Sequence, residues 1–259
     1  MRRALHSTAN GSDKFWRVAT LGDQSAVYWG KSGTIGRVKI TEYSDEDACL
    51  KAANALADAK LKRGYEELDE AAATAAFEEH IYLDDQEEWG PHPLTSHPRF
   101  TAHFTGDVWF DPSDEEAPFG SDEGSDAMSS VTDAVRARGR AVTFGDLPRV
   151  IVENEWEMEY VPPALITPAE ADAAVAAESR FRGLPQSQIL SQSDQVTIAV
   201  AVAQAKIFGT MQPDLKEAAL LAVARLGEVI AAEFRPNGRA PVMSDVAAEV
   251  LRGISTFQN

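Results

Sequence analysis

Alternating apolar and polar positions near the start of the chain predict three strands and a helix. Aromatic and β-branched residues, bounded by glycine turns, mark strands at Lys14–Leu21, Ser25–Gly30 and Arg37–Tyr43. Small and apolar residues then recur at helical spacing from Asp45 to Arg63, and Gly64 is placed to stop that helix. The pattern therefore predicts a small antiparallel sheet with one helix packed on it.

Helical periodicity dominates the rest of the chain. Apolar stripes predict helices at Pro168–Arg182, Ser193–Phe208, Pro213–Phe234 and Met243–Ile254. Residues 69–99 combine an alanine- and glutamate-rich helix with a proline-rich stretch, which is typical of a linker. We therefore expect an α+β protein with a disordered N-terminus (1–12), a sheet-and-helix domain (13–68), a helical and proline-rich linker (69–99) and an acidic, mostly helical domain (100–255).

The formal net charge of −17 arises entirely after residue 70. The first 70 residues hold 11 Lys and Arg against 11 Asp and Glu, whereas the remainder holds 13 against 30. Residues 1–40 are basic, with seven Lys and Arg against two acidic side chains. Such asymmetry predicts two modules with different partners. DNA is the candidate partner of the basic part, and a basic protein is the candidate partner of the acidic part.

Composition and motifs narrow the class of protein further. Cys49 is the single cysteine, so neither an intrachain disulfide nor a cysteine-based zinc finger is possible. The N-terminus has no apolar stretch after its two arginines, and the most apolar window, Val196–Gly209, is too short to cross a bilayer. No phosphate-binding loop, dinucleotide fingerprint or nucleophile elbow is present, so no cofactor is predicted. We therefore expect a cytoplasmic protein without a membrane segment.

The sheet domain carries three landmarks in order. A strand ends in Trp29-Gly30-Lys31, a Gly33-Thr34-Ile35-Gly36 turn follows, and the helix ends in Lys62-Arg63-Gly64-Tyr65. Together they resemble the WGR domain, over roughly residues 11–68. WGR domains of DNA-dependent poly(ADP-ribose) polymerases grip a DNA break, with the motif tryptophan packed on the terminal nucleotide. Others occur in bacterial proteins that resemble the molybdate-metabolism regulator. The resemblance therefore implies nucleic-acid binding.

One residue departs from the WGR pattern, because Lys31 stands where the motif has arginine. Lysine keeps the positive charge but lacks the planar, bidentate fork, which favours phosphate contact over recognition of a DNA end. An aromatic side chain beside cations is the minimum for stacking combined with phosphate contact. Two structural alternatives remain open: Trp29 fills the small core, and the cations are ordinary solvated charges. The candidate nucleic-acid-binding residues are Arg17, Trp29, Gly30, Lys31, Arg37 and Lys39.

A run of carboxylates between residues 107 and 126 is the second candidate site. Oxygen-rich loops of this kind can hold Ca²⁺ or Mg²⁺, although the calcium-loop template lacks its central glycine and terminal glutamate here. In a metal-dependent hydrolase, at least three of these carboxylates would have to converge. The alternative to a metal site is a surface loop that caps the next helix. We favour this interpretation, because it accounts for the carboxylates without a metal. The candidate ligands are Asp107, Asp111, Asp114, Glu115, Asp122 and Asp126.

The same stretch carries a second resemblance. Ser96-His97-Pro98, Trp109 to Asp111, Asp114-Glu115 and Pro118 to Ala127 resemble the YfeS-like family of uncharacterised bacterial proteins, over about residues 96–235. Members of that family are known with WGR modules in front, and no activity is established for it. The resemblance therefore implies a family for the 100–255 domain without implying a reaction.

Three functional classes remain. The first, which we favour, is a non-enzymatic nucleic-acid-binding or regulatory adaptor whose acidic helical domain contacts a protein partner. The second is a protein–protein adaptor, inhibitor or immunity-type protein that covers a basic partner without nucleic acid. The third is a metal-dependent hydrolase built on the acidic loop, for which the sequence offers no evident nucleophile and no helix-spaced ligand pair.

Overall fold

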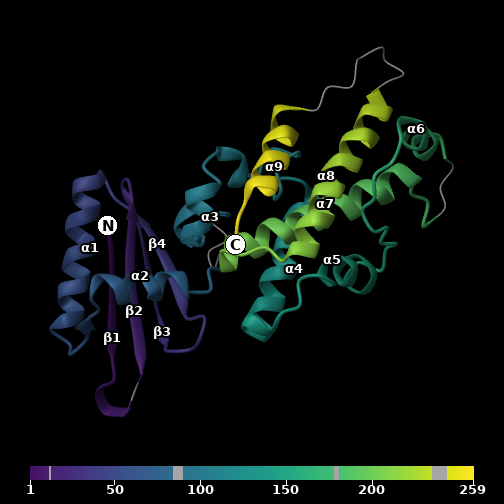
Figure 1. The fold of residues 1–259 in the computed structure, drawn as a ribbon. Helices are drawn as coiled ribbons and strands as arrows, with labels where there is room; N and C mark the ends of the chain where they lie inside the picture. Colours follow the sequence, from purple (N-terminus) through teal and green to yellow (C-terminus); the bar gives the residue numbers. More distant parts are fainter. Residues whose placement is uncertain (12, 84–89, 178–180, 235–243) are drawn as a thin grey trace. The chain divides into compact units, whose positions relative to one another are not determined.

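The computed structural model describes residues 1–11, 13–83, 90–177, 181–234 and 244–259 (Figure 1). The chain folds into two compact units. The N-terminal unit comprises residues 1–102 together with 207–209, and the C-terminal unit comprises residues 103–206 and 210–259. The first is built on a sheet and the second on helices, which confirms the predicted α+β class.

One five-stranded antiparallel sheet forms the N-terminal unit, with the strand order β4-β3-β2-β1-β5 (Figure 1). The strands are β1 (Arg2–Ser7), β2 (Lys14–Leu21), β3 (Gln24–Lys31), β4 (Arg37–Glu42) and the short β5 (Glu66–Glu67). The predicted bounds of β2, β3 and β4 are confirmed to within about one residue at each end. Alternation and glycine turns are local signals, so the sequence alone could place these three strands.

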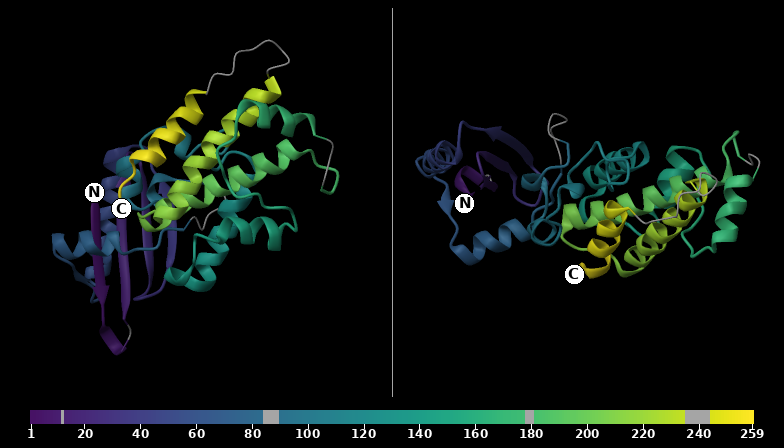
Figure 2. Two further views of the ribbon diagram at one scale, coloured as in Figure 1. Left: turned by 45° about the vertical axis from the view of Figure 1, so that its right-hand side comes forward. Right: turned by 90° about the horizontal axis from the view of Figure 1, so that it is seen from above.

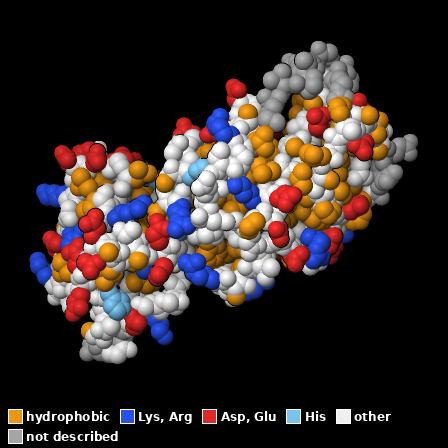
Figure 3. All heavy atoms as spheres, viewed as in Figure 1, with side chains coloured by type: hydrophobic (Ala, Val, Ile, Leu, Met, Phe, Trp, Pro, Cys, Tyr) orange, Lys and Arg blue, Asp and Glu red, His pale blue; other side chains and the backbone are white. Residues whose placement is uncertain are grey.

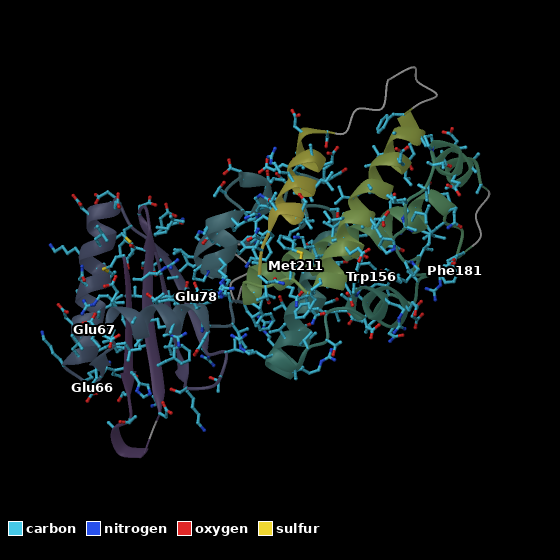
Figure 4. The ribbon with its side chains drawn as sticks, in the orientation of Figure 1. Glu66, Glu67, Glu78, Trp156, Phe181 and Met211 are labelled. Atoms are coloured by element: carbon cyan, nitrogen blue, oxygen red, sulfur yellow. The ribbon has the colours of Figure 1, made fainter. Side chains whose placement is uncertain are left out.

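The N-terminus is ordered where the sequence predicts disorder, because Arg2–Ser7 forms β1 between β2 and β5. Ala4 and Leu5 are both buried, in the cores on opposite faces of the sheet. Arg3 donates from Nε to Oε1 of Glu67 at 2.7 Å, which joins β5 to β1. Figure 4 labels Glu67 at this edge of the sheet. The prediction of disorder for this segment is therefore wrong. Two apolar residues in succession lack the period-2 alternation by which strands are recognised.

Helix α1 (Glu46–Leu61) covers one face of the sheet. It begins where the Asp45 side chain accepts a hydrogen bond from the Ala48 backbone at 2.8 Å, which satisfies a free N–H of the first turn. The buried stripe of the helix is made of small side chains, so the helix can approach the sheet closely. The core beneath it contains Leu5, Trp16, Val18, Ala53 and Ala57.

The opposite face of the sheet is covered by the segment that the sequence predicts to be a linker. Helix α2 (Glu70–Glu78) and the residues after it contribute aromatic and aliphatic side chains to a second core. That core includes Phe15, Tyr28, Phe77, Tyr82 and Leu94. The linker interpretation of residues 69–99 is therefore wrong for their described part, which belongs to the N-terminal unit. Its prolines indicate irregular backbone, which is compatible with burial of the neighbouring side chains.

Helices make up the C-terminal unit (Figure 2). In chain order the helices are α3 (Pro98–His103) at the division between the units, α4 (Asp122–Arg138), α5 (Leu147–Val150) with a π-helical turn (Ile151–Glu155), α6 (Pro168–Ala176), α7 (Gln186–Phe208), α8 (Pro213–Phe234) and α9 (Asp245–Thr256). Helix α8 packs against both α6 and α9. In the described part of the chain, no helix has the length and apolar character that a membrane span requires.

Short 3-10 turns complete the secondary structure at Ala9–Gly11, Pro93–Thr95, Asp107–Trp109 and Gly139–Ala141. The bounds of α8 are those predicted, whereas α7 begins at Gln186, ahead of the predicted Ser193. The first two turns of α7 are mostly polar and therefore show little apolar periodicity. The predicted start of the last helix, Met243, lies outside the described residues.

A buried ion pair joins α7 to α8. Arg225, which is 2% exposed, donates from Nε to Oδ2 of the fully buried Asp194 at 2.9 Å and from Nη2 to Oδ1 at 2.8 Å. The same guanidinium donates to the backbone carbonyls of Pro162 and Val161, both at 2.8 Å. Burial raises the pKa of Asp194 to about 7, against the opposite effect of Arg225. The pair therefore fastens the segment before α6 to two helices.

Candidate nucleic-acid interface

Strand register places Trp29 on the face of the sheet that α1 partly covers. Trp16 and Trp29 are cross-strand partners on β2 and β3, and Arg37 pairs with Trp29 from β4. Directly paired residues point to the same side of a sheet. Helix α1 packs over Trp16, which is 3% exposed, whereas Trp29 is 37% exposed. The alternative in which Trp29 fills the core is therefore wrong, and Trp16 occupies that position.

Exposed cations flank Trp29 on this side of the sheet. Lys31 follows Trp29 by two residues on β3, and Lys14 is the cross-strand partner of Lys31. Lys39 lies two residues beyond Arg37 on β4, so it shares their side. None of these cations forms an ion pair with a described carboxylate. We call Lys14, Trp29, Lys31, Arg37 and Lys39 the Trp29 face.

Two basic residues near this face were absent from the candidates. Lys14 joins it through strand pairing, which can be recognised only once the register is known. Lys60, in the last turn of α1, places Nζ 5.9 Å from the Trp16 ring centre and 5.2 Å from that of Tyr65. Burial lowers the pKa of Lys60, and the charges of Arg63 and Lys14 lower it further. The end of α1 therefore adds positive charge beside Lys14.

Gly30 shapes the backbone of the candidate site. A Cβ atom at Gly30 would lie 2.7 Å from the Gly36 Cα and 3.1 Å from the Phe15 ring. Only a residue without a side chain lets β3 and the following turn approach this closely. Close packing therefore explains the glycine of the Trp-Gly-Lys motif. Trp29 and Lys31, its neighbours in sequence, both lie on the opposite face of the strand from the Phe15 ring.

Gly36 offers a direct test of this close approach. It has a φ of 75°, and a Cβ atom there would lie 2.5 Å from the Phe15 ring and 2.7 Å from the Trp29 carbonyl oxygen. We expect Gly36→Ala to lower the free energy of unfolding by at least about 2 kcal/mol, because backbone strain and overpacking add. Gly33→Ala is the matched control, since φ is 79° but no described atom lies within 4 Å of its Cβ position. Equal losses in urea unfolding would contradict the packing role.

Arg17 lies on the other face of the sheet. It pairs with Ala4 and Tyr28, whose side chains belong to the core beneath α2. Its guanidinium carbon lies 4.6 Å from the centre of the Phe15 ring. Burial lowers the pKa of Arg17, and Nη1 is buried without a hydrogen-bond partner among the described residues. The structure therefore separates Arg17 from the other candidates, because strand residues of opposite parity point to opposite faces.

The exposure of Trp29 leads to a prediction about stability. We expect Trp29→Ala to leave the protein folded and to cost less than the about 3–5 kcal/mol of truncating a fully buried tryptophan, because Trp29 is 37% exposed. Urea unfolding followed by circular dichroism measures this change. Loss of the folded state in this variant would return Trp29 to a core role and remove the reason for proposing it as a binding residue.

The carboxylates of the acidic loop make local hydrogen bonds. Asp111 accepts from the backbone and the hydroxyl of Ser113, at 2.8 and 2.6 Å, and Asp114 accepts from the Glu116 backbone at 2.9 Å. The bonds from Ser113 hold the pKa of Asp111 below its usual range. Among the described residues, no three His, Cys, Asp or Glu side chains come together as a metal site. The convergence that a hydrolase needs is therefore not found there.

The other candidate ligands are spread over separate elements. Asp107 opens a 3-10 turn, Glu115 is exposed in the loop, and Asp122 and Asp126 are exposed near the start of α4. Ser121 begins α4, and its hydroxyl accepts a backbone hydrogen bond at 3.0 Å. A loop that caps a helix is therefore confirmed, but the cap is Ser121, whereas the sequence predicts it at Ser125 and Asp126, which lie inside α4.

Comparison with known proteins covers both units. The model of the WGR domain family matches residues 1–72, so the match includes β1, which precedes the region of resemblance. The chain is 36% identical over 214 residues to the "Uncharacterized protein YfeS" of Escherichia coli strain K12. That alignment covers 83% of this chain and 82% of the relative.

A solved structure shows only a low similarity. It is a crystal structure of a protein from Bacteroides fragilis, with 24% sequence identity and a TM-score of 0.27. The match covers 42% of this chain and 31% of that chain. The identity and coverage of the E. coli relative are far higher. The chain therefore belongs to the YfeS family and carries a WGR domain at its N-terminus.

Proposed function

We propose that this protein is a non-enzymatic adaptor that binds DNA through the Trp29 face and contacts a basic protein partner through its acidic C-terminal unit. The observation that carries the DNA-binding half is the exposure of Trp29 among cations that form no ion pair with a described carboxylate, although Lys31 acts electrostatically on Asp13. An exposed tryptophan offers a stacking platform for a base, and the lysines and arginine offer contacts to phosphates. Gly30 and Arg17 act in the fold instead of at the interface.

The charge of the Trp29 face sets the kind of binding that we expect. Lys31 carries a point charge, whereas the arginine of the WGR motif carries a planar guanidinium that can donate two parallel hydrogen bonds. Lys31 therefore contacts a phosphate without fixing the geometry of a DNA end. The few cations of this face act against a net charge of −17 over the whole chain. Affinity should therefore be modest and should fall steeply as salt is added.

Fluorescence anisotropy of the full chain with labelled nicked, blunt-ended and single-stranded DNA tests this proposal. At physiological salt we expect a dissociation constant on the order of 10⁻⁶ to 10⁻⁴ M, as for sequence-independent binding, and tighter binding at low salt. On duplex DNA, the slope of log affinity against log salt should be about −0.9 for every phosphate contacted. Absence of binding to all three DNAs at low salt would contradict the DNA-binding half of the proposal.

A second function is favoured by the location of the negative charge. All of the net −17 lies in residues 71–259, so that part of the chain could cover a basic surface without any nucleic acid. The protein would then be an adaptor or inhibitor, and the WGR domain would serve as a docking face for protein. This alternative gains support if no DNA binds while an isolated basic partner associates with the full chain at a rate that falls with salt.

A further inference from the structure

A cavity in the C-terminal unit lies between α7, α8, α9 and the loop before α4. Its volume is about 420 Å³, which is within the range of about 300–1,000 Å³ that small-molecule sites occupy. Hydrophobic side chains gather over α8 in the space-filling view (Figure 3). The apolar part of the wall includes Ile198, Val223, Ile230, Phe234, Ala247 and Val250. Water in such a cavity would be displaced favourably by an apolar body.

The polar groups of the cavity wall are acceptors and carboxylates. Glu115, Glu116 and Glu228 all line it, and none of its described lining residues is Lys, Arg or His. Glu116 accepts a hydrogen bond from the hydroxyl of Ser244, the residue that caps α9, which fixes its position at the edge. The charged groups among the described lining residues are all negative, so they would repel an anionic ligand and attract a cation.

Gly227 leaves the wall of the cavity open along α8. It lies in the middle of α8 and lines the cavity, although glycine is a poor residue for a helix interior. A Cβ atom at this position would have no described atom within 4 Å, so packing within the protein does not require a glycine. The helix backbone at Gly227 is therefore accessible from the cavity, and a side chain placed there would enter empty space.

We propose that this cavity binds a small amphipathic ammonium compound. Its apolar body fills the space over Gly227, and its cationic group lies at the edge formed by Glu115 and Glu228. Carboxylates, phosphates and nucleotides are excluded by the same acidic edge. This inference is independent of DNA binding, because it uses no residue of the N-terminal unit.

Two probes of equal size and opposite charge test the proposal. Isothermal titration of the full chain with 1-aminoadamantane and with adamantane-1-carboxylate compares a cation and an anion on the same apolar body. We expect the ammonium compound to bind at least about tenfold more tightly, because a carboxylate a few ångströms away favours the cation and repels the anion. Backbone amide shifts in NMR spectra should change for residues of α8 and α9.

Two substitutions identify the cavity as the site. Gly227→Leu places a side chain in the empty space and improves the helix, so we expect an unchanged fold and loss of ammonium binding. Glu228→Gln should weaken binding of the ammonium compound by about threefold or more and strengthen binding of the carboxylate probe, because the same negative charge attracts one probe and repels the other. Glu159→Gln, at an exposed glutamate that does not line the cavity, is the matched control and should change neither.

The proposal is overturned by any of three results. These are equal affinity for the two probes, unchanged ammonium binding in Gly227→Leu, and amide shifts confined to residues away from α8 and α9. If circular dichroism shows that Gly227→Leu is unfolded, Glu228→Gln decides, because this substitution exposes no new apolar surface. An unchanged affinity of Glu228→Gln for the ammonium compound then overturns the proposal.

Discussion

Replacing Trp29 with alanine and Lys31 with glutamate in one chain should abolish DNA binding at moderate salt. Stacking of a base on an aromatic ring contributes about 1–3 kcal/mol, and this contribution is lost with the indole. The second substitution turns an attraction to phosphate into a repulsion. Together we expect a loss of about a hundredfold or more in affinity, which corresponds to about 2.7 kcal/mol. Fluorescence anisotropy with blunt-ended and nicked DNA measures the loss.

A matched double variant separates the Trp29 face from a general effect of charge. Leu56 and Lys51 are both exposed on α1, so Leu56→Ala with Lys51→Glu removes one apolar side chain and reverses one charge elsewhere in the same unit. We expect this control to retain most of the affinity. Both double variants should keep the circular dichroism spectrum of the unaltered protein. If the Trp29 variant binds DNA as tightly as the control, the Trp29 face is not the interface.

The sequence predicts where the strands lie, but it does not predict which residues of neighbouring strands share one face of the sheet. The strands β2, β3 and β4 were predicted nearly to the residue, because alternation and glycine turns are local signals. Charge alone groups Arg17 with Lys31, yet their cross-strand partners differ and the two side chains lie on opposite faces of the sheet. Lys14 was missed for the same reason. Cross-strand register, which is a long-range property, decides both assignments.

Packing between distant segments explains the errors in domain organisation. The prolines between residues 90 and 99 are typical of a loop, and that indication was sound. However, Leu94 enters the core on the β-sheet face that also holds Tyr28, whose hydroxyl donates to the Leu94 carbonyl. A segment can therefore be irregular in backbone and still complete a core. Local composition reports the first property and carries little information about the second.

In the acidic loop a local signal predicts that a capped helix follows, but it places the cap at Ser125 and Asp126, four residues too late. A serine or aspartate before a helix, followed by carboxylates in the first turn, is stabilised by free backbone N–H groups and by the helix dipole. Ser121 and Asp122 occupy these positions at the start of α4. The physical reason for so many carboxylates in one loop is thus partly structural, and Glu115 and Glu116 remain available to shape the cavity edge.

Replacing Arg225 should strongly lower the free energy of unfolding of the C-terminal unit. Arg225→Met leaves Asp194 buried without its cation and two backbone carbonyls without donors. Breaking a buried pair from one side costs about 3–5 kcal/mol. We therefore expect urea unfolding of Arg225→Met at pH 8 to show a decrease of that size. Neither residue was identified from the sequence, because each lies within a helix that was predicted from apolar periodicity.

The pH dependence of this defect identifies its cause. Burial raises the pKa of Asp194 in the folded protein to about 7, above the ordinary value of an unfolded chain, and loss of the Arg225 charge should raise it further. A carboxyl group with a raised folded pKa destabilises the fold above that pKa, and the penalty shrinks as pH falls and the group is protonated. The defect of Arg225→Met should therefore be smaller at pH 5 than at pH 8. A loss that is equal at both values would indicate a packing defect.

Two further variants complete the argument for the ion pair. Asp194→Leu combined with Arg225→Met removes both charges, so the double variant should recover part of the stability that Arg225→Met alone loses. Arg149→Met is the exposed control, because Arg149 pairs with Glu153 at 3.3 Å in solvent and should contribute only about 0.3–0.5 kcal/mol. The double variant could instead be as unstable as Arg225→Met. In that case the charge left on Asp194 is not the cause of the loss. The hydrogen bonds from Arg225 to the backbone before α6 then stabilise this part of the C-terminal unit.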